Sequence, residues 1–587
     1  MSEKHWLVAE AAPDEWHAQF PELSHTLRHL LWHRGIRTPE AAEEFLHPDY
    51  GRHVHDPFLF RDMRKAVERV LEVIAAVEVV GIFGDYDADG VTGSVILAST
   101  LRALGAKIEI YIPHREKEGY GLSKAAVSFF LDRGAKIIIT CDCGIASVEE
   151  IAMAQAGGVA VIITDHHTIP EKIPNAFAIL HPLVPGNGYP FLYLTGGGVA
   201  FKFACALIFE SCKKSSLPTT NSSLPTPHSI AEGFEKWLLD LVAISTVADV
   251  GKLIGENRVF VKYGLIVLQK TRRLGLKKLY AKASIDPRSI DAWSIAFQIT
   301  PRINAAGRMD HASSAFKMLM TETEAEAEEF ASFLIRVNTE RQKVTERMIE
   351  EAKRQIGAGE GKSFLSAYQE DWPLGVVGLV AGRIAEEYGK PTLIACKTPM
   401  GHLAGSIRSI PQFDVVPALH EAKSHMMRYG GHPMAAGFSV ENIDIYGRLC
   451  QKLDEVARER LAGVDMRRTL RIDAELSLQE INWKLWGALE SMEPFGEGNS
   501  RPKFAARRLS VVAVDRVGNG GKHLRLTVAG ATGGRRKMIG FNFGDWARKI
   551  ELGERVDVAF ELGVNEWNGN RELQMKIADL RLSEKEG

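Results

Sequence analysis

The sequence has few features typical of membrane or exported proteins. Its six cysteines are scattered among 587 residues, and Cys141-x-Cys143 lacks the second pair that a structural zinc site needs. The first residues contain no apolar run followed by a small-residue cleavage site, and no uninterrupted apolar stretch is long enough to span a bilayer. We therefore expect a cytoplasmic protein with reduced thiols and no membrane contact.

A strong net charge is also missing, since the formal charge is −2. The local distribution is more informative, because the segment from Arg501 to Lys549 contains twelve Lys or Arg and two Asp. A basic surface of this kind favours a polyanionic partner, although a solvated face of a strand-rich module is equally compatible with it.

From Val79 onward, short β-branched segments alternate with helical ones. Segments expected to be strands end at Phe83, Thr140 and Thr164, with a helical segment between successive strands. This β-α-β rhythm predicts a parallel sheet with helices on both faces, and hence an α/β fold.

The chain is too long for one hydrophobic core, and its composition suggests several parts. We expect a disordered insertion where Ser, Thr and Pro are concentrated, a long helix rich in Glu, Arg, Lys and Ala, and short strands with turn signals near the end. The predicted parts are an N-terminal helical segment (1–75), a first α/β domain (76–320, with the insertion at 213–228), a connecting helix (321–360), a second α/β domain (361–462) and a small β-barrel (467–587).

Carboxylates and imidazoles follow three of the expected strands. They are Asp85, Asp87 and Asp89 after the first strand, Asp142 after the second, and Asp165, His166 and His167 after the third. A single Asp in such a place is more often a helix cap than a ligand, by roughly three to one. However, open parallel sheets bind their ligands at the carboxyl ends of the strands, so three such placements indicate one site.

The ligand types indicate which cation the site would hold. The run Asp85-x-Asp-x-Asp-Gly also matches the start of a calcium loop, but that loop needs Glu at its twelfth position, where this chain has Ile96. Carboxylates mixed with imidazole suit Mn²⁺ or Mg²⁺, and two such ions close together hydrolyse phosphate esters. The sequence therefore predicts a metal-dependent phosphoesterase.

At these residues the chain resembles the Asp-His-His phosphoesterase superfamily, whose last acidic motif matches Asp249. The resemblance implies two ions, Mn²⁺ or Mg²⁺, and makes either Asp85 and Asp87 or Asp87 and Asp89 direct ligands. The other implied ligands are Asp142 as the bridge, His166 and Asp249. It also implies two catalytic residues. These are His167, which would contact the scissile phosphate or help to transfer a proton, and Asp165, which would orient the histidines.

Further motifs resemble the RecJ family of single-strand-specific DNA exonucleases. They are Pro301–Arg308, Gly405–Ser409, Gly430–Gly437 and Pro494–Asn499. The similarity covers almost the whole chain from Val79 and implies that the C-terminal barrel is of the oligonucleotide-binding (OB) type. The residues that would bind phosphate or DNA are Arg302, Asn304, Arg308, Ser406, Arg408 and His432. One departure from the family is Pro373, where a histidine is common.

The resemblance implies 5′→3′ removal of nucleotides from single-stranded DNA in recombination and repair. The expected partners are single-stranded DNA and replication or repair proteins such as a single-strand-binding protein, with a monomeric chain. Bases could stack on aromatic residues of the barrel, although each could equally fill its core; the candidates are Phe541, Phe543, Trp546 and Trp567. Two alternatives remain: a phosphoesterase for small substrates such as cyclic dinucleotides, and a non-catalytic replication scaffold.

Overall fold

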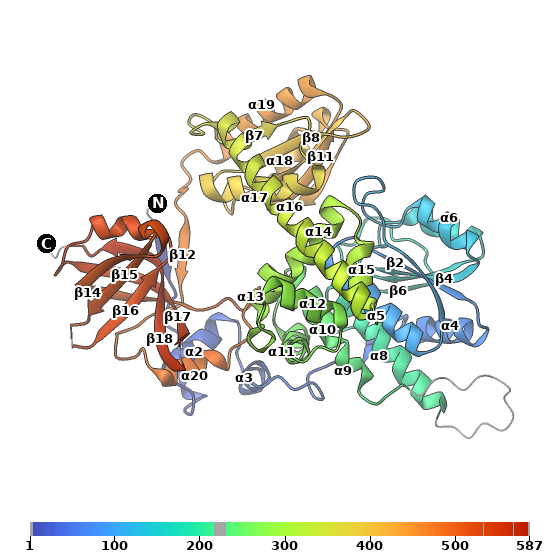
Figure 1. Ribbon diagram of the computed structural model, residues 1–587, viewed down its shortest axis with the longest axis horizontal. Helices are drawn as coiled ribbons and strands as arrows, with labels where there is room; N and C mark the ends of the chain where they lie inside the picture. The colour runs from blue at the N-terminus through green and yellow to red at the C-terminus, as the bar shows by residue number, and fades with distance from the viewer. Residues whose placement is uncertain (1–3, 216–229, 532, 568, 585–587) are drawn as a thin grey trace. The chain divides into compact units, whose positions relative to one another are not determined.

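A computed structural model describes residues 4–215, 230–531, 533–567 and 569–584 (Figure 1). The chain forms two compact units. The α/β unit comprises residues 55–251 and 263–466, and the barrel unit comprises residues 1–54, 252–262 and 467–587. All six cysteines are free, as the sequence predicts.

The first sheet of the α/β unit is wholly parallel, which confirms the predicted α/β fold. Its strand order is β3 (Lys107–Tyr111), β2 (Val79–Gly84), β4 (Ala135–Cys141), β5 (Ala160–Thr164) and β6 (Ala178–Leu180). After β3 the chain crosses to the other side of β2, so the strand order reverses between β2 and β4. That reversal is the place where a sheet of this kind opens a crevice for a ligand.

Helices cover both faces of this sheet (Figure 1). On one face lie α4 (Met63–Ala75), α5 (Ala88–Ala103) and α8 (Gly196–Ser215); on the other lie α6 (Lys124–Asp132) and α7 (Val148–Ala156). Phe83, Ile138 and Ile163 point to the α6 and α7 side, where they join a fully buried core with Phe130. The predicted disordered insertion at 213–228 is wrong at its start, because Lys213 to Ser215 end α8; from residue 216 it lies outside the described residues.

A helical layer and a long helix follow the first sheet. The shorter helices are α9 (Phe234–Trp237), α10 (Leu239–Ala248), α11 (Gly255–Gln269), α12 (Leu274–Ala283), α13 (Ala292–Ser294), the π-helix η3 (Ile295–Ile299), α14 (Thr300–Met309) and α15 (Ser313–Met320). The long helix, α16 (Glu324–Ile356), follows its N-cap Thr323 and packs against α12, α14 and α17 (Leu374–Tyr388). It matches the predicted connecting helix.

The second sheet of the α/β unit is mixed. Its order is β10 (Arg428–His432), β11 (Ala435–Val440), β9 (Leu403–Arg408), β8 (Thr392–Lys397) and β7 (Leu365–Tyr368), with only β7 and β8 parallel. One face packs against α16 and α17 (Leu374–Tyr388). The other packs against α18 (Val415–Glu421) and α19 (Ile443–Arg460).

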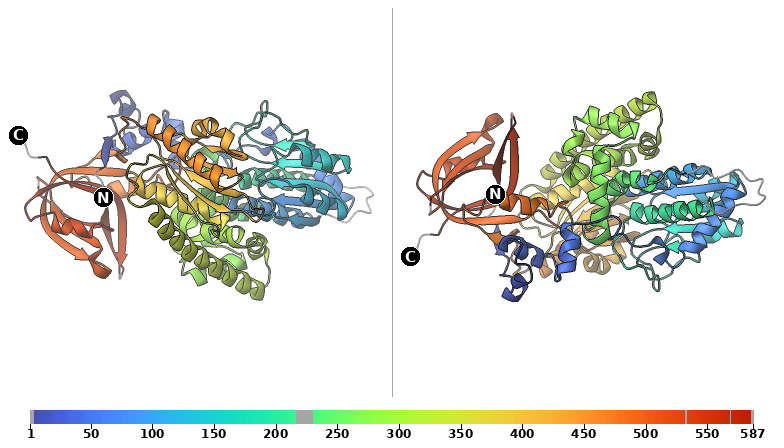
Figure 2. Two further views of the ribbon diagram at one scale, coloured as in Figure 1. Left: turned by 90° about the horizontal axis from the view of Figure 1, so that it is seen from above. Right: turned by 90° about the horizontal axis from the view of Figure 1, so that it is seen from below.

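The barrel unit contains a closed five-stranded barrel, as predicted (Figure 2). Its strands are β14 (Lys503–Val517), β15 (His523–Ala529), β16 (Arg535–Gly540), β18 (Asn570–Leu582) and β17 (Arg555–Trp567), and β17 pairs back with β14. Of the aromatic candidates, Phe543 is buried in the barrel core, Trp546 packs partly against it and Phe541 is 54% exposed. The side chain of Trp567 lies outside the described residues.

The N-terminal residues belong to the same hydrophobic core as the barrel. Helices α1 (Asp14–Ala18), α2 (His25–His33) and α3 (Pro39–Leu46) share this core with α20 (Trp483–Glu490) and the barrel strands. The expected helical segment also contains a strand, β1 (His5–Val8), which pairs in parallel with β12 (Thr469–Ile472). A second short strand, β13 (Ala474–Glu475), pairs with β14.

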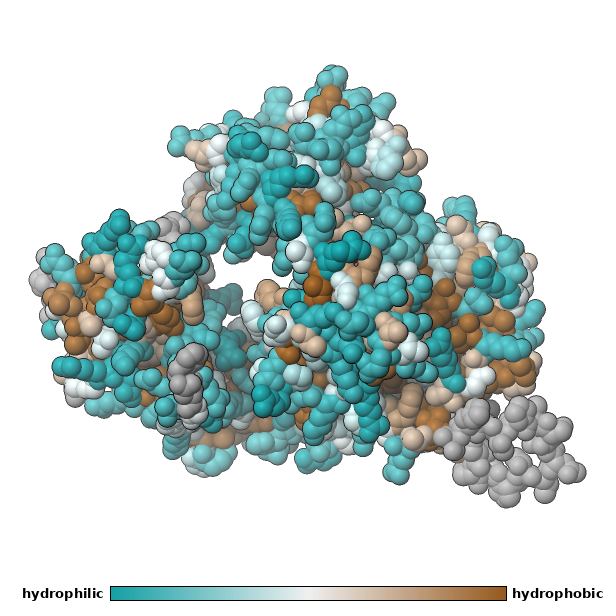
Figure 3. Space-filling model, viewed as in Figure 1, coloured by the Kyte–Doolittle hydropathy of each residue, from teal (hydrophilic) through white to brown (hydrophobic). Residues whose placement is uncertain are grey.

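No described helix is both long enough and apolar enough to cross a membrane. The face of the molecule in Figure 3 is mainly hydrophilic, with hydrophobic residues scattered singly or in small groups.

Arg258 of α11 joins distant segments of the barrel unit. It is 1% exposed. Its guanidinium donates to the carbonyl oxygens of Phe45 at 2.7 Å, Glu493 at 2.8 Å, Pro494 at 3.2 Å and Ser491 at 3.4 Å. The same group lies 4.0 Å from the centroid of the Phe45 ring.

Replacing Arg258 with Ala should therefore destabilise the barrel unit. Several buried carbonyls lose their donor, at roughly 1–3 kcal/mol each and not additively, so we expect a loss of about 2–4 kcal/mol. Hydrogen exchange should show lower protection in α3 and in residues 491–494, and unchanged protection in the first sheet of the α/β unit. The control is Arg288→Ala, which removes the exposed ion pair of Arg288 with Asp286. This variant should change neither the stability of the barrel unit nor its hydrogen-exchange protection. Equal protection in both variants would contradict the role of Arg258.

Candidate metal site

The acidic and histidine residues meet where the strand order of the first sheet reverses. Asp85 directly follows β2, Asp142 directly follows β4 and His166 lies two residues after β5. Asp249 directly follows the last residue of α10. The structure thus brings together every residue that the sequence predicted as a metal ligand.

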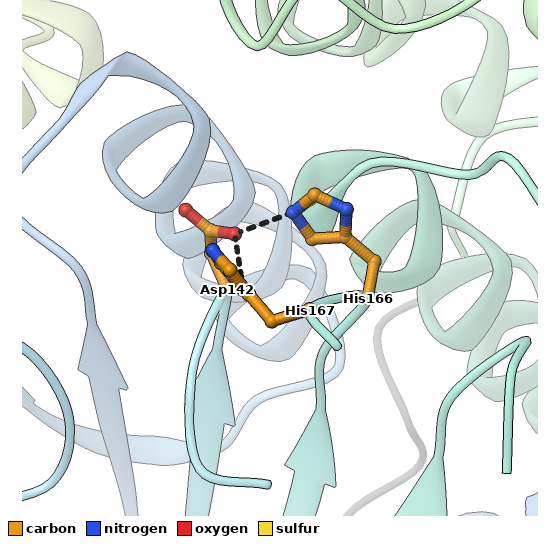
Figure 4. A group of neighbouring side chains, drawn as sticks. All are labelled: Asp142, His166 and His167. Atoms are coloured by element: carbon orange, nitrogen blue, oxygen red, sulfur yellow. Dashed lines mark hydrogen bonds and ion pairs between the residues drawn. The ribbon is translucent and has the colours of Figure 1, made fainter. Parts of the chain in front are cut away.

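His166 lies at the centre of this group. Its Nε2 atom is 3.0 Å from Oδ1 of Asp142, 3.5 Å from Oδ2 of Asp89 and 3.6 Å from Oδ2 of Asp249. The Nδ1 atom of His167 is 3.8 Å from the same oxygen of Asp142. Figure 4 shows both imidazole rings facing this carboxylate.

Three overlapping groups have their ligand atoms within 4.8 Å of one another. They are Asp85, Asp87 and Asp142; Asp89, His166 and Asp249; and Asp142, His166 and His167. Asp142 belongs to two groups that otherwise contain different residues, which is the position a bridging ligand takes between two ions. All three acids of the first turn belong to such groups: Asp85 and Asp87 share one with Asp142, and Asp89 shares one with His166 and Asp249. The structure therefore does not choose between the pairs Asp85/Asp87 and Asp87/Asp89.

The electrostatics of these carboxylates favour a bound cation. Burial and the neighbouring charge of Asp87 raise the pKa of Asp85, while burial and the charge of Asp89 raise that of Asp142. Burial, with the charges of Asp89 and Asp87, raises the pKa of Asp249 to about 8. Oδ1 of Asp85 is buried and has no hydrogen-bond partner. A divalent cation would relieve this repulsion, and the carboxylate and imidazole donors fit Mn²⁺ or Mg²⁺.

Asp165 holds the two histidines in place. Its side chain is fully buried, and Oδ1 accepts from the backbone N–H of His166 at 2.7 Å and from Nδ1 of His167 at 2.8 Å. Its other oxygen accepts from the N–H of Ile145 at 3.0 Å. Burial alone would raise the pKa of Asp165, but these donors outweigh it and lower the pKa to about 2. In return, Asp165 raises the pKa of His167 to about 9 against the effect of burial.

Asp87 and Asp89 are held by backbone amides. Asp87 is the N-cap of α5, and its Oδ1 accepts from the N–H groups of Asp89 and Gly90. Asp89 accepts from the N–H of Gly196 at 2.7 Å and of Gly197 at 2.8 Å, at the start of α8. These glycines were not predicted from the sequence, although three consecutive glycines at the start of an apolar helix were the available signal.

Gly196 also allows a close approach to Asp142. A Cβ atom at Gly196 would lie 2.5 Å from Cβ and 2.7 Å from Oδ1 of Asp142. Asp142 itself has φ +62°, a conformation that costs energy for a residue with a side chain. The position of this carboxylate is therefore fixed both by its own strained backbone and by the glycine next to it.

Tyr120 also belongs to the site and was not predicted from the sequence. Its hydroxyl donates to the carbonyl oxygen of Asp142 at 3.0 Å and lies 2.9 Å from Nδ1 of His167. Its ring lies 5.2 Å from that of His167, and the residue is 48% exposed. A lone tyrosine between two glycines gave no chemical signal in the sequence.

The predicted phosphate-binding residues lie in two places. Asn304 accepts from the N–H of Ala88 at the start of α5. Arg308 donates to the carbonyl oxygen of Gly375 at 3.1 Å, and the charges of Arg115, Asp87 and Arg408 all act on it. Arg302 lies six residues before Arg308, near the start of α14, and donates to the carbonyl oxygen of Gln298.

The other three predicted phosphate-binding residues, Ser406, Arg408 and His432, lie on the second sheet. Nη1 of Arg408 donates to Oγ of Ser406 at 2.5 Å. The strand register pairs Arg408 with Ala435, and Ala435 with His432, so these residues lie in one row across β9, β11 and β10. A Cβ atom at Gly378 of α17 would lie 3.0 Å from Nη2 of Arg408 and 3.3 Å from Oγ of Ser406, so this helix packs closely over both residues.

Comparisons with known proteins agree with this architecture. The family models that match are described as DHH family, N-terminal domain (residues 79–245), DHHA1 domain (361–459) and RecJ OB domain (472–579). The single-stranded-DNA-specific exonuclease RecJ of Bacillus subtilis is 35% identical over 94% of this chain and 68% of its own length. The protein of the same name from Salmonella typhimurium is 32% identical over 96% of this chain and 97% of its own.

Solved structures of RecJ also resemble this chain over nearly its whole length. The crystal structure of RecJ in complex with Mn²⁺ from Thermus thermophilus has a TM-score of 0.81 and 29% identity, and covers 99% of this chain and 80% of that one. The corresponding structure with Mg²⁺ has a TM-score of 0.76, 28% identity, and covers 99% of this chain and 79% of that one.

The glycine contacts lead to a test of metal binding. Gly196→Ala should weaken Mn²⁺ binding at least tenfold, because the new Cβ displaces the carboxylate of Asp142. The matched control is Gly198→Ala, since a Cβ at Gly198 would meet only ordinary contacts at 3.4 Å or more. Free Mn²⁺, measured by electron paramagnetic resonance during a titration, gives the affinity. Similar affinities for the two variants would show that Asp142 does not hold the metal.

Proposed function

The chain belongs to the RecJ family, and we propose that it is a metal-dependent exonuclease that removes nucleotides from single-stranded DNA in the 5′→3′ direction. The observation that carries the proposal is the place of Asp142 between two further groups of ligand residues at the edge of the first sheet. Family membership supports the single-stranded substrate and the direction of cleavage.

The proposed ligands are the three acids of the first turn with Asp142, His166 and Asp249. Bound Mn²⁺ or Mg²⁺ would supply Lewis-acid activation of the phosphodiester and of the attacking water. His167 is proposed to contact the phosphate; its side chain is 38% exposed, whereas that of its partner Asp165 is fully buried, which supports this role. The ion pair with Asp165 keeps His167 protonated at neutral pH in the metal-free protein, so that it can donate a hydrogen bond or a proton to a phosphate oxygen.

Residues of α14 and of the second sheet are proposed to hold the strand. Arg308 and Arg408 affect each other electrostatically, and the hydroxyl of Ser406 contacts Arg408. Guanidinium groups bind phosphate oxygens through paired hydrogen bonds, which fixes the register of the strand at the metal site. His432 lies in the same row as Arg408, and Asn304 shapes the turn that carries Asp87.

The barrel unit is proposed to bind single-stranded DNA outside the metal site. Its fold is the one used by single-strand-binding barrels, and Phe541 is its exposed aromatic candidate, with basic side chains on β14 and β16. We further propose a cytoplasmic, monomeric protein that acts in recombination and repair together with partners such as a single-strand-binding protein.

The two alternatives are less well supported. A phosphoesterase for small substrates would not need the barrel, whose family model matches residues 472–579. A non-catalytic scaffold would not need to keep the ligand set, yet all the predicted ligands are present and meet at one point.

Asp142→Asn should abolish exonuclease activity, by a factor of about 10³ or more, while single-strand binding remains. The amide keeps the shape of the side chain but cannot serve as an anionic bridge between two cations. The assay uses 5′-labelled and 3′-labelled single strands, each with Mn²⁺, Mg²⁺ or chelator, and duplex DNA as the control substrate. Early release of the 5′ label as mononucleotide is expected. Asp444→Asn, in the exposed first turn of α19, is the control variant. Release of the 3′ label first would refute the proposed direction.

Arg408→Ala should reduce capture of the strand more than the rate of cleavage. A donor that positions phosphate away from the ions acts mainly on binding, so KM should rise about tenfold or more while the single-turnover rate at saturating DNA stays within about threefold. Arg458→Ala changes a 63% exposed arginine of α19 and should alter neither quantity. A fall in the saturating rate with unchanged KM would assign Arg408 to the transition state instead.

A further inference from the structure

Four histidines of the N-terminal helices form two pairs of contacting rings in the barrel unit. His17 of α1 stacks on His25 of α2, with ring centroids 4.2 Å apart, and the rings of His29 and His33 of α2 lie 4.6 Å apart. The three histidines of α2 are spaced by four residues, so they project from one side of that helix. Each pair combines a buried ring with an exposed one, since His17 is 8% and His29 is 7% exposed. A proton on any of these rings would therefore place a positive charge against its neighbour.

The second pair attaches α2 to segments outside the helix. Nε2 of His29 lies 2.7 Å from the carbonyl oxygen of Asp473, to which it donates because a carbonyl only accepts. The carboxylate of Asp473 in turn accepts from the backbone N–H of Lys503, the first residue of β14, at 2.9 Å. Nε2 of His33 lies 2.8 Å from the carbonyl oxygen of Glu10. The imidazoles thus belong to the contacts that hold the N-terminal helices on the barrel strands.

The surroundings of His17 disfavour a charged ring. Its Nδ1 atom is buried and finds no hydrogen-bond partner among the described residues. The guanidinium of Arg28 donates to the carbonyl oxygen of His17, and Asp14 is the acid whose charge acts on this ring. Burial first, and then the charges of His25 and Arg28, lower the pKa of His17, and Asp14 offsets this effect only in part.

The second pair also lies among more bases than acids. Burial lowers the pKa of His29 against the hydrogen bond to Asp473, and the other three histidines lower it further. His33 borders a cavity of about 720 Å³. The other charged residues that line this cavity are Arg34, Arg471, Asp473, Glu497, Arg501 and Lys503. Nη1 of Arg34 already lies 3.7 Å from the carboxylate of Asp473, so the lining offers no net negative charge to a protonated row.

We propose that these four imidazoles form an acid-sensitive lock, which holds the N-terminal helices on the barrel while the rings are neutral and releases them when the rings take up protons. The lock does not depend on the exonuclease function, because all its residues belong to the barrel unit. Released helices accept protons near the ordinary histidine value of 6.5, whereas the buried rings do not. The lock is therefore closed above that pH and weakens as the pH falls below it. Each buried ring raises the opening equilibrium by up to about tenfold per pH unit.

Hydrogen exchange of the full chain at pH 7.5 and pH 5.5 tests the lock, with exchange times scaled to the intrinsic rate at each pH. The opening equilibrium of residues 14–33 should increase at least tenfold at the lower pH, because two buried rings contribute to it. Strand β8 of the second sheet is the internal reference and should change less than threefold.

The double variant His17→Phe/His29→Gln should reduce this increase to less than threefold. Phe keeps a ring against His25 without a nitrogen that takes up a proton, and the amide of Gln keeps a donor for Asp473. The matched control is His47→Gln, an exposed histidine at the end of α3 in the same unit, which should respond like the unchanged protein. Each single variant should remove about half of the increase on a logarithmic scale, and these variants carry the test if the double variant does not fold.

The outcomes separate the lock from the proposed function. Equal increases in the double variant and the unchanged protein would overturn the lock. An equal increase in β8 would also overturn it, because acid would then unfold the chain as a whole. The exchange measurements use neither DNA nor metal, so they decide the lock whether or not the protein cuts DNA. Failure to cut single strands would refute the exonuclease alone.

Discussion

Repulsion among buried carboxylates is the constraint on which the first domain depends. Asp85 and Asp87 lie close to Asp142, while Asp89 and Asp249 lie close to His166. Burial and the neighbouring negative charges raise the pKa of Asp85, Asp142 and Asp249. The surrounding structure holds them there by backbone amides: those of α5 on Asp87 and those of α8 on Asp89. Such amides stabilise the ionised form without a competing positive side chain. The charge of the group is thus left to be balanced by a metal ion.

The sequence was sufficient for those features that follow from periodicity and strand order. Strands β2 to β5 and helix α16 lie within a few residues of their predicted positions, because alternating β-branched runs and a long stretch without Gly or Pro are strong local signals. The meeting of Asp142 with the histidines followed from the rule that parallel strands end at the same edge. The OB-type barrel was predicted from turn signals together with the family resemblance.

Contacts between distant segments could not be predicted in this way. The amides of Gly196 and Gly197 reach Asp89 across more than a hundred residues, and Tyr120 reaches His167 from a loop. Strand β1 has its partner at the far end of the chain, so nothing local distinguishes it from the helices that follow. The surroundings of Arg302 and Arg308 also differ only in the structure: one helix carries both, but Arg308 donates to Gly375 and Arg302 donates to Gln298.

The composition of the barrel unit has a consequence for synthesis of the protein. Residues 1–54 leave the ribosome well before residue 467, yet the core in which Trp16, Leu30 and Phe45 are buried is completed only by strands that follow that residue. The α/β unit, which lies between them in the sequence, has all of its residues available earlier. The α/β unit can therefore fold while the N-terminal helices still lack their partner strands and expose apolar side chains to solvent. A chaperone or slow elongation would matter most in this interval, and a chain stopped near residue 466 would keep its metal site but carry an unpaired hydrophobic N-terminus.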